Sequence, residues 1–232
     1  MRVTMLGCGS SGGVPLLGPD GWGSCDPKDP RNRRRRVSVL IEQGDTRVLV
    51  DTSPDLREQL LAAKVSALDA VVYTHTHADH LHGIDELRSI NALARRPLDI
   101  WADPGSMAEI RRRFSYAFGP APVSTDREDW YRPVLTPHEY EGPFRIGAIG
   151  FTPFAQQHGR HGSMGLRCGG FAYSTDVKAL SEDAFAILAG VELWIVDCLQ
   201  MEPHRTHSHF AQTLEWIARV KPRRAVLTHL NH

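Results

Sequence analysis

The feature that most constrains this 232-residue chain is a cluster of metal-ligating side chains directly after an apolar run. Residues 68–73 are rich in β-branched and aromatic side chains, which predicts a buried strand. His75, His77, Asp79 and His80 then follow in close succession. Residues two apart in an extended segment share a face, so one pair can approach one ion while the next pair turns toward a second. Imidazole and carboxylate groups suit zinc and manganese, so the cluster predicts a metal site rather than a polar surface turn.

The spacing His75-x-His77-x-Asp79-His80 resembles the signature of the metallo-β-lactamase superfamily. The resemblance extends along nearly the whole chain, in the family's order, to residues that each follow an apolar segment. It implies three further ligands. His158 matches the third histidine of a first metal, Asp176 the carboxylate that bridges both metals, and His229 the last histidine of a second metal.

The resemblance also implies the cofactors and the side chains that work with them. Two divalent ions, Mn²⁺ or Zn²⁺, would be bridged by Asp176 and a solvent molecule, whose pKa falls toward neutrality so that it becomes a hydroxide nucleophile. Asp51 occupies the family's structural aspartate position, where it is expected to organise the metal loop by hydrogen bonds. Asp79 and His207 are the expected catalytic side chains, with His207 protonating the departing alkoxide. The alternative for His207 is ordinary surface polarity.

The fold class that the resemblance implies is α/β, an αββα sandwich of two mixed β-sheets flanked by helices. Residues 1–232 are expected to form one hydrolase domain. Related enzymes usually continue past His229, which leaves the alternative that a short C-terminal segment is missing. Residues 119–140, rich in proline and aromatic side chains, are expected to be irregular, and the charge of residues 111–113 is assigned to a solvated face. Caps and apolar patterning predict helices at residues 54–64, 82–93, 105–118, 181–188 and 210–220.

The composition limits the cellular context and the partners. Lys plus Arg and Asp plus Glu both total 27, so no overall field favours nucleic acid or an acidic membrane surface. The four cysteines form no CxxC pair, which argues against a disulfide framework or a cysteine-only zinc site. The first residues lack the apolar length of a signal peptide, and no run reaches the roughly 20 apolar residues of a membrane span. We therefore expect a cytoplasmic protein that does not bind membranes.

Two further stretches are candidates for substrate or metal contacts. The glycine-rich residues 7–15 lack the lysine of a P-loop, so they predict a tight turn beside the site. Arg35 and Arg36 close an arginine run that is either a solvated segment or a phosphate contact, since arginine binds phosphate in a bidentate manner. In the PhnP-like phosphodiesterases that the chain resembles, cysteines in this region and a late histidine hold an additional zinc. The matching residues here are Cys25 and His232.

The ligand set narrows the reaction within the family. His77 stands where oxygen-reducing diiron members carry glutamate, and Asp176 stands where lactam-cleaving members typically use cysteine. This leaves phosphodiesters or thioesters as substrates. The glycine-rich opening loop, the arginine run and His207 together favour a phosphodiesterase acting on a small cyclic or nucleotide-like phosphodiester. The alternatives are a glyoxalase II-like thioester hydrolase and a nucleic-acid-binding or processing protein of the tRNase Z type. The latter is not favoured, because the chain has no long arm for gripping tRNA. A homodimer is the expectation for the resembling enzymes.

Overall fold

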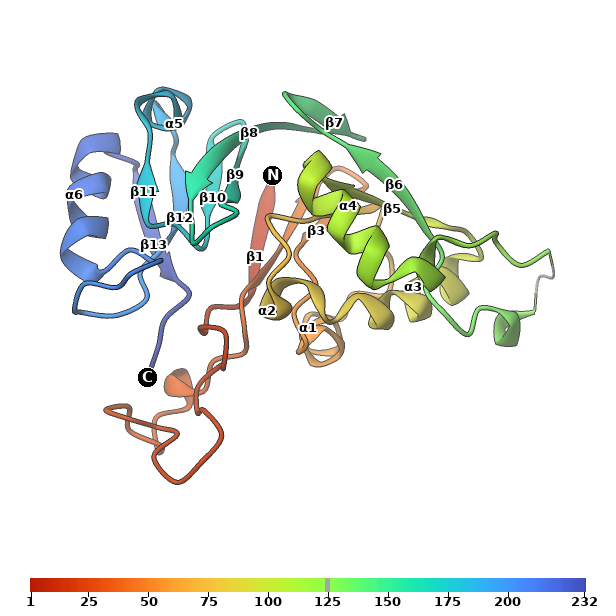
Figure 1. The fold of residues 1–232 in the computed structure, drawn as a ribbon, viewed down its shortest axis with the longest axis horizontal. Helices are drawn as coiled ribbons and strands as arrows, with labels where there is room; N and C mark the ends of the chain where they lie inside the picture. Colours follow the sequence, from red (N-terminus) through yellow and green to blue (C-terminus); the bar gives the residue numbers. More distant parts are fainter. Residues whose placement is uncertain (124–125) are drawn as a thin grey trace. The chain divides into compact units, whose positions relative to one another are not determined.

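Two mixed β-sheets with flanking helices form the fold in the computed structural model, which describes residues 1–123 and 126–232. The chain divides into two compact units, coloured along the sequence in Figure 1. The first unit consists of Met1–Leu6, Ser38–Glu141 and Arg145–Ile149, and the second of Gly7–Val37, Gly142–Phe144 and Gly150–His232. The predicted fold class, with two mixed sheets and outer helices, is confirmed.

The sheet of the first unit has the strand order β1-β2-β3-β4-β5-β6. β2 and β3 form an antiparallel hairpin, whereas β3, β4, β5 and β6 run parallel to one another. The three residues of β4 are fully buried, as a strand in the middle of a parallel sheet requires. The strand bounds are Arg2–Gly7, Ser38–Gln43, Thr46–Val50, Ala70–Val72, Leu98–Ala102 and Leu135–Glu139.

The helices of the first unit bury their apolar sides in one core cluster. Leu56, Ile90 and Met107 come from three of these helices and join strand residues such as Leu49 and Ile100. α4 begins where Asp103 accepts a hydrogen bond from the Ser106 amide, and Pro104 occupies its first turn. The helices are α1 (Leu56–Ala63), α2 (Ala78–Leu81), α3 (Leu87–Ala94) and α4 (Pro104–Arg113), with 3-10 turns η2 (Ile84–Glu86), η3 (Ser115–Phe118) and η4 (Arg127–Asp129).

The second unit repeats the arrangement with the strand order β11-β8-β9-β10-β12-β13. β8, β9 and β10 are antiparallel, and β10, β12 and β13 are parallel. The buried Trp194 indole donates a hydrogen bond to Ser174 Oγ at 3.0 Å, which joins β12 to β10. The strands are β8 (Ile149–Gln157), β9 (Ser163–Cys168), β10 (Phe171–Ser174), β11 (Ala179–Leu180), β12 (Leu193–Asp197) and β13 (Arg224–Thr228), and the helices are η1 (Pro30–Asn32), α5 (Glu182–Leu188) and α6 (Phe210–Val220). β7 (Phe144–Ile146) contains the boundary between the units.

Several predicted elements need correction. The expected helix 105–118 ends at Arg113 and continues as a 3-10 turn, and the expected helix 82–93 forms only from residue 84 onward. Residues 119–140 were expected to be irregular, but β6 lies within them; Pro137 obscures the strand pattern and is tolerated because β6 is an edge strand. Residues 124 and 125 of that segment lie outside the described residues. None of the described helices combines the length and the apolar character needed to cross a bilayer.

Candidate metal-binding site

Asp51 anchors the histidine cluster of the first unit. It follows β3, whose parallel neighbour β4 ends just before Thr74, so the two strand ends bring these residues together. Asp51 Oδ1 accepts the Thr74 amide at 2.8 Å, while Oδ2 accepts the Thr74 hydroxyl at 2.8 Å and His80 Nδ1 at 2.7 Å. Burial raises the pKa of Asp51, whereas the adjacent His80 and the Thr74 donors act in the opposite direction. Asp51 adopts the left-handed conformation with φ 63°, which aspartate tolerates better than most residues.

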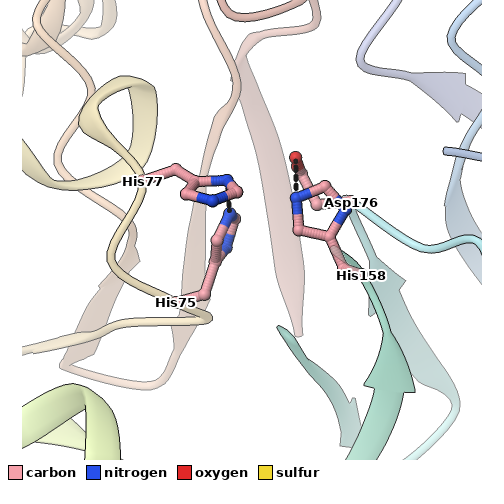
Figure 2. Close-up of side chains that lie close together, drawn as sticks. All are labelled: His75, His77, His158 and Asp176. Atoms are coloured by element: carbon pink, nitrogen blue, oxygen red, sulfur yellow. Dashed lines mark hydrogen bonds and ion pairs between the residues drawn. The ribbon is translucent and has the colours of Figure 1, made fainter. Parts of the chain in front are cut away.

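The hydrogen bonds determine which nitrogen of His75 carries a proton. The Thr74 hydroxyl has one hydrogen, which it donates to Asp51, so its oxygen accepts from His75 Nδ1 at 3.1 Å. His75 Nε2 therefore presents its lone pair, and it lies 3.0 Å from His77 Nδ1. Figure 2 draws this contact as a dashed line. His80 follows the same rule: Nδ1 bonds to Asp51, and Nε2 lies 3.2 Å from Asp79 Oδ2.

The second half of the cluster lies on a short helix rather than in an extended loop. α2 begins after His77 and includes Asp79 and His80, both buried, whereas His77 is exposed. The simple alternation expected from the sequence therefore stops at His77. Gly83 follows this helix because a Cβ there would lie 2.0 Å from the Ser53 carbonyl oxygen. This close approach allows the Gly83 amide to bond to the Thr52 carbonyl at 2.9 Å.

In the second unit, three imidazoles converge on Asp176. His158 Nε2 lies 3.5 Å from Asp176 Oδ1, the pair drawn in Figure 2. His229 Nε2 and His207 Nε2 lie 3.4 Å and 3.8 Å from the same oxygen. His158 Nδ1 contacts the Thr206 carbonyl at 2.9 Å, and because a carbonyl only accepts, this nitrogen carries the proton. Asp176 and His229 follow β10 and β13 in left-handed conformations, with φ 52° and 59°.

Asp197 is a further member of this group that the sequence analysis missed. It is fully buried at the end of β12. Its Oδ2 accepts the amides of Val177 and Ser208 at 3.1 and 3.3 Å and lies 3.2 Å from His207 Nδ1. Asp197, His207 and His229 each offer a ligand atom within 4.8 Å of the others. The signal that could have identified Asp197 is the one that suggested Asp176, an acidic residue close after an apolar strand.

The donor groups of each unit fit a divalent cation. Nearly all are buried, and the imidazoles of His75, His80 and His158 are each held through Nδ1, so that Nε2 can bind an ion. Nitrogen and carboxylate donors without thiolates suit zinc and manganese. The candidates are His75, His77, Asp79 and His80 in the first unit, and His158, Asp176 and His229 in the second.

The arginine run and the proposed extra metal ligands lie in the second unit. The Gly9 amide bonds to the Arg35 carbonyl at 2.8 Å, and Gly9 forms isolated β-bridges with Arg36 and with Leu230. The opening loop and the arginine run therefore lie beside the residue that follows His229. Arg34 contacts the last residues of the chain, with Nη1 3.2 Å from the Asn231 carbonyl oxygen.

Cys25 and His232 are the two residues named for an additional metal. Arg34 Nη1 lies 3.8 Å from Cys25 Sγ, and its positive charge there opposes a bound cation. His232 Nδ1 lies 2.9 Å from Asn231 Oδ1. Among the described residues, neither Cys25 nor His232 belongs to a group of three or more potential metal ligands.

Comparisons with known proteins place these residues in a family context. A family model described as the Beta-lactamase superfamily domain matches residues 46–230. The whole chain is 33% identical to a Porphyromonas gingivalis protein named octanoyltransferase, of which it covers 46%. A ribonuclease Z of Bradyrhizobium sp. is 30% identical over 59% of this chain and 45% of its own length, so the chain spans about half of these curated relatives. The crystal structure of a diphosphatase from the PhnP family has a TM-score of 0.87 and 30% identity, covering 98% of this chain and 85% of that one.

Proposed function

This chain belongs to the β-lactamase superfamily and is PhnP-like, and we propose that it is a phosphodiesterase that cleaves a small cyclic or nucleotide-like phosphodiester. Metal-dependent hydrolases belong to this superfamily, and the histidine and aspartate groups of both units are of the donor type that such hydrolases need. The similarity to a diphosphatase of the PhnP family, a name that denotes hydrolysis at phosphorus, supports a phosphorus-centred reaction.

We infer that the chain binds two ions, Mn²⁺ or Zn²⁺. When bound, such ions supply a nucleophile from solvent near neutral pH and offset the charge that develops on the phosphate in the transition state. Histidine Nε2 atoms are the expected donors of His75, His80 and His158, because their Nδ1 atoms are held by hydroxyl, carboxylate and carbonyl groups. The residues assigned to a first ion are His75, His77 and His158, those assigned to a second are Asp79, His80 and His229, and Asp176 is assigned to both.

The observation that carries the phosphodiester assignment is the pair formed by Asp197 and His207. Asp197 accepts from His207 Nδ1, so the other ring nitrogen faces Asp176, at 3.8 Å from its Oδ1. A histidine held in this way can give a proton from Nε2 to a leaving group beside Asp176. An alkoxide leaving a phosphodiester needs that proton, whereas the thiolate leaving a thioester needs it far less. The pair therefore favours phosphodiester over thioester hydrolysis.

A second candidate is cleavage of a phosphodiester in RNA. The ribonuclease Z relative, 30% identical over 59% of the chain, is the observation that favours it. The name octanoyltransferase supports no acyl transfer here, because the matched part is 46% of that relative. The cytoplasmic location and the homodimer expected from the sequence stay predictions.

The test is hydrolysis of bis(p-nitrophenyl) phosphate by metal-stripped protein reloaded with Mn²⁺ or Zn²⁺. We expect activity to return with the metal and to be lost in Asp176→Asn. The exposed His161, near His158 in the sequence, supplies a matched control, and His161→Asn should retain activity. Metal-replete, folded protein that cleaves a thioester of glutathione but no phosphodiester would overturn the proposal.

A second set of substrates tests the role of His207. The variant His207→Asn should lose more activity toward an alkyl phosphodiester than toward the p-nitrophenyl ester, since p-nitrophenolate departs without much need of a proton. An equal loss of activity on both substrates would show that His207 does not donate a proton to the leaving group. A pre-tRNA substrate that is cleaved faster than small cyclic phosphodiesters would favour the ribonuclease alternative.

A further inference from the structure

The backbone of the metal loop is held at two carbonyl groups on either side of His75. The buried Tyr140 hydroxyl donates to the Tyr73 carbonyl at 3.2 Å. Arg113 Nη1 donates to the Thr76 carbonyl at 2.8 Å. Both contacts lie within the first unit and come from residues far along the chain. The second contact falls on the peptide between the two histidines of the H-x-H pair.

The Thr76 carbonyl matters because of the residue that follows it. His77 is exposed, whereas His75, Asp79 and His80 are buried, so packing restrains the His77 side chain less than theirs. Its position relative to His75 Nε2, 3.0 Å from its Nδ1, therefore depends on the peptide plane that joins residues 76 and 77. A donor on the Thr76 carbonyl fixes the orientation of that plane.

The guanidinium of Arg113 is itself held in place. Its Nε bonds to Glu109 Oε1 at 2.5 Å, one turn back on α4, which leaves Nη1 directed at the loop. Arg112 binds the same carboxylate through two nitrogens, at 2.7 Å each. The two arginines lower the pKa of Glu109 to about 2, so this partner stays ionised over the working pH range. Arg111 instead lies over the Phe118 ring, 5.8 Å from its centroid.

We propose that Arg113 is a positioning residue for the metal loop, where it fixes the peptide that carries His77. The inference rests on the proposed function, because it assumes that His75 and His77 bind a metal ion. The sequence predicts that the charges of residues 111–113 lie on a solvated face, and Arg113 departs from this prediction because it bonds to the Thr76 carbonyl. Arg112 fits that prediction, since its side chain is largely exposed and bonds to Glu109 on the same helix, whereas Arg113 reaches the loop.

The chain offers a matched control for this proposal in Arg112. Arg112→Ala and Arg113→Ala remove the same side chain from adjacent positions of one helix, and each removes one of the two arginine partners of Glu109. Zinc affinity is measured by competition with a chromophoric chelator. We expect Arg113→Ala to bind zinc about 10-fold more weakly, the loss typical when a group that orients a ligand is removed. Arg112→Ala should match the unaltered protein, because an exposed ion pair contributes little.

A second readout needs no metal. Hydrogen exchange of the metal-free protein should speed up in the segment 74–80 of Arg113→Ala and remain unchanged in Arg112→Ala. Arg113→Lys should restore part of the zinc affinity, because an ammonium group can donate to the Thr76 carbonyl. Equal zinc affinity and equal exchange in Arg113→Ala and the unaltered protein would overturn the proposal while leaving the proposed function intact. Failure of the unaltered protein to bind zinc would instead overturn the proposed metal site.

Discussion

Replacing Thr74 by valine tests whether the hydroxyl network beneath the histidine cluster prepares the site for metal. Valine keeps the β-branched shape of threonine and removes only the hydroxyl. That hydroxyl donates to Asp51 and accepts from His75 Nδ1, in a region with no solvent access. The substitution therefore removes a bond to a carboxylate and leaves the His75 N–H without its acceptor.

The structure allows the size of this effect to be worked out. A hydrogen bond to a charged group contributes about 1.5–3 kcal/mol, and a buried donor that loses its acceptor costs about 1–3 kcal/mol. The extra buried methyl group returns about 0.8 kcal/mol. We expect the metal-free protein to lose about 3 kcal/mol of unfolding free energy. Zinc affinity should fall about 10-fold or more, because His75 is no longer held through Nδ1.

Thr52→Val is the matched control. Thr52 is equally buried, and its hydroxyl donates to the Leu81 carbonyl at 3.0 Å and lies 3.1 Å from the Tyr73 hydroxyl. Neither contact involves a charge or a histidine ring, so we expect a loss of about 1 kcal/mol and unchanged zinc affinity. Urea unfolding of the metal-free variants gives the stabilities, and chelator competition gives the affinities. If Thr74→Val behaves like Thr52→Val in both assays, the reasoning about proton placement on His75 is wrong.

Two other perturbations follow from contacts within single units. Asp197→Asn should reduce kcat for an alkyl phosphodiester about 100-fold while KM changes little, because His207 loses the acceptor of its Nδ1 proton. Steady-state kinetics measure both constants, and an unchanged kcat would show that Asp197 does not support proton donation by His207. Gly83→Ala should lower the unfolding free energy by about 3 kcal/mol, because its Cβ would lie 2.0 Å from the Ser53 carbonyl oxygen. Gly142→Ala, where a Cβ meets nothing within 4 Å, should show no such loss in the same urea titration.

The parts of the fold that the sequence predicts well are those determined by local patterns. α6 occupies Phe210–Val220, as expected from its amphipathic spacing, because it has one apolar side and a clear end at Lys221. The residues after β4, β10 and β13 were found because an apolar run followed by a polar residue marks a strand end. These patterns can be recognised within a segment, without knowing which other segments it packs against.

The parts that the sequence does not predict depend on contacts between distant segments. β6 is a strand because it pairs in parallel with β5, although Pro137 weakens its own pattern. The contact between Arg113 and Thr76 joins residues 37 positions apart, so three successive arginines look equivalent in the sequence and differ in the structure. Asp197 belongs to the site because β12 lies between β10 and β13, and this order is a property of the sheet.

The left-handed backbone at Asp51, Asp176 and His229 limits which residues evolution or an engineer can place there. Asparagine, aspartate, histidine and glycine enter that conformation at low cost, whereas valine, isoleucine and threonine do not. A substitution by a β-branched residue would strain the backbone, whatever the chemistry of the new side chain. Attempts to recruit a different metal at Asp176 or His229 therefore have a short list of starting residues, set by torsion angles rather than by coordination preference.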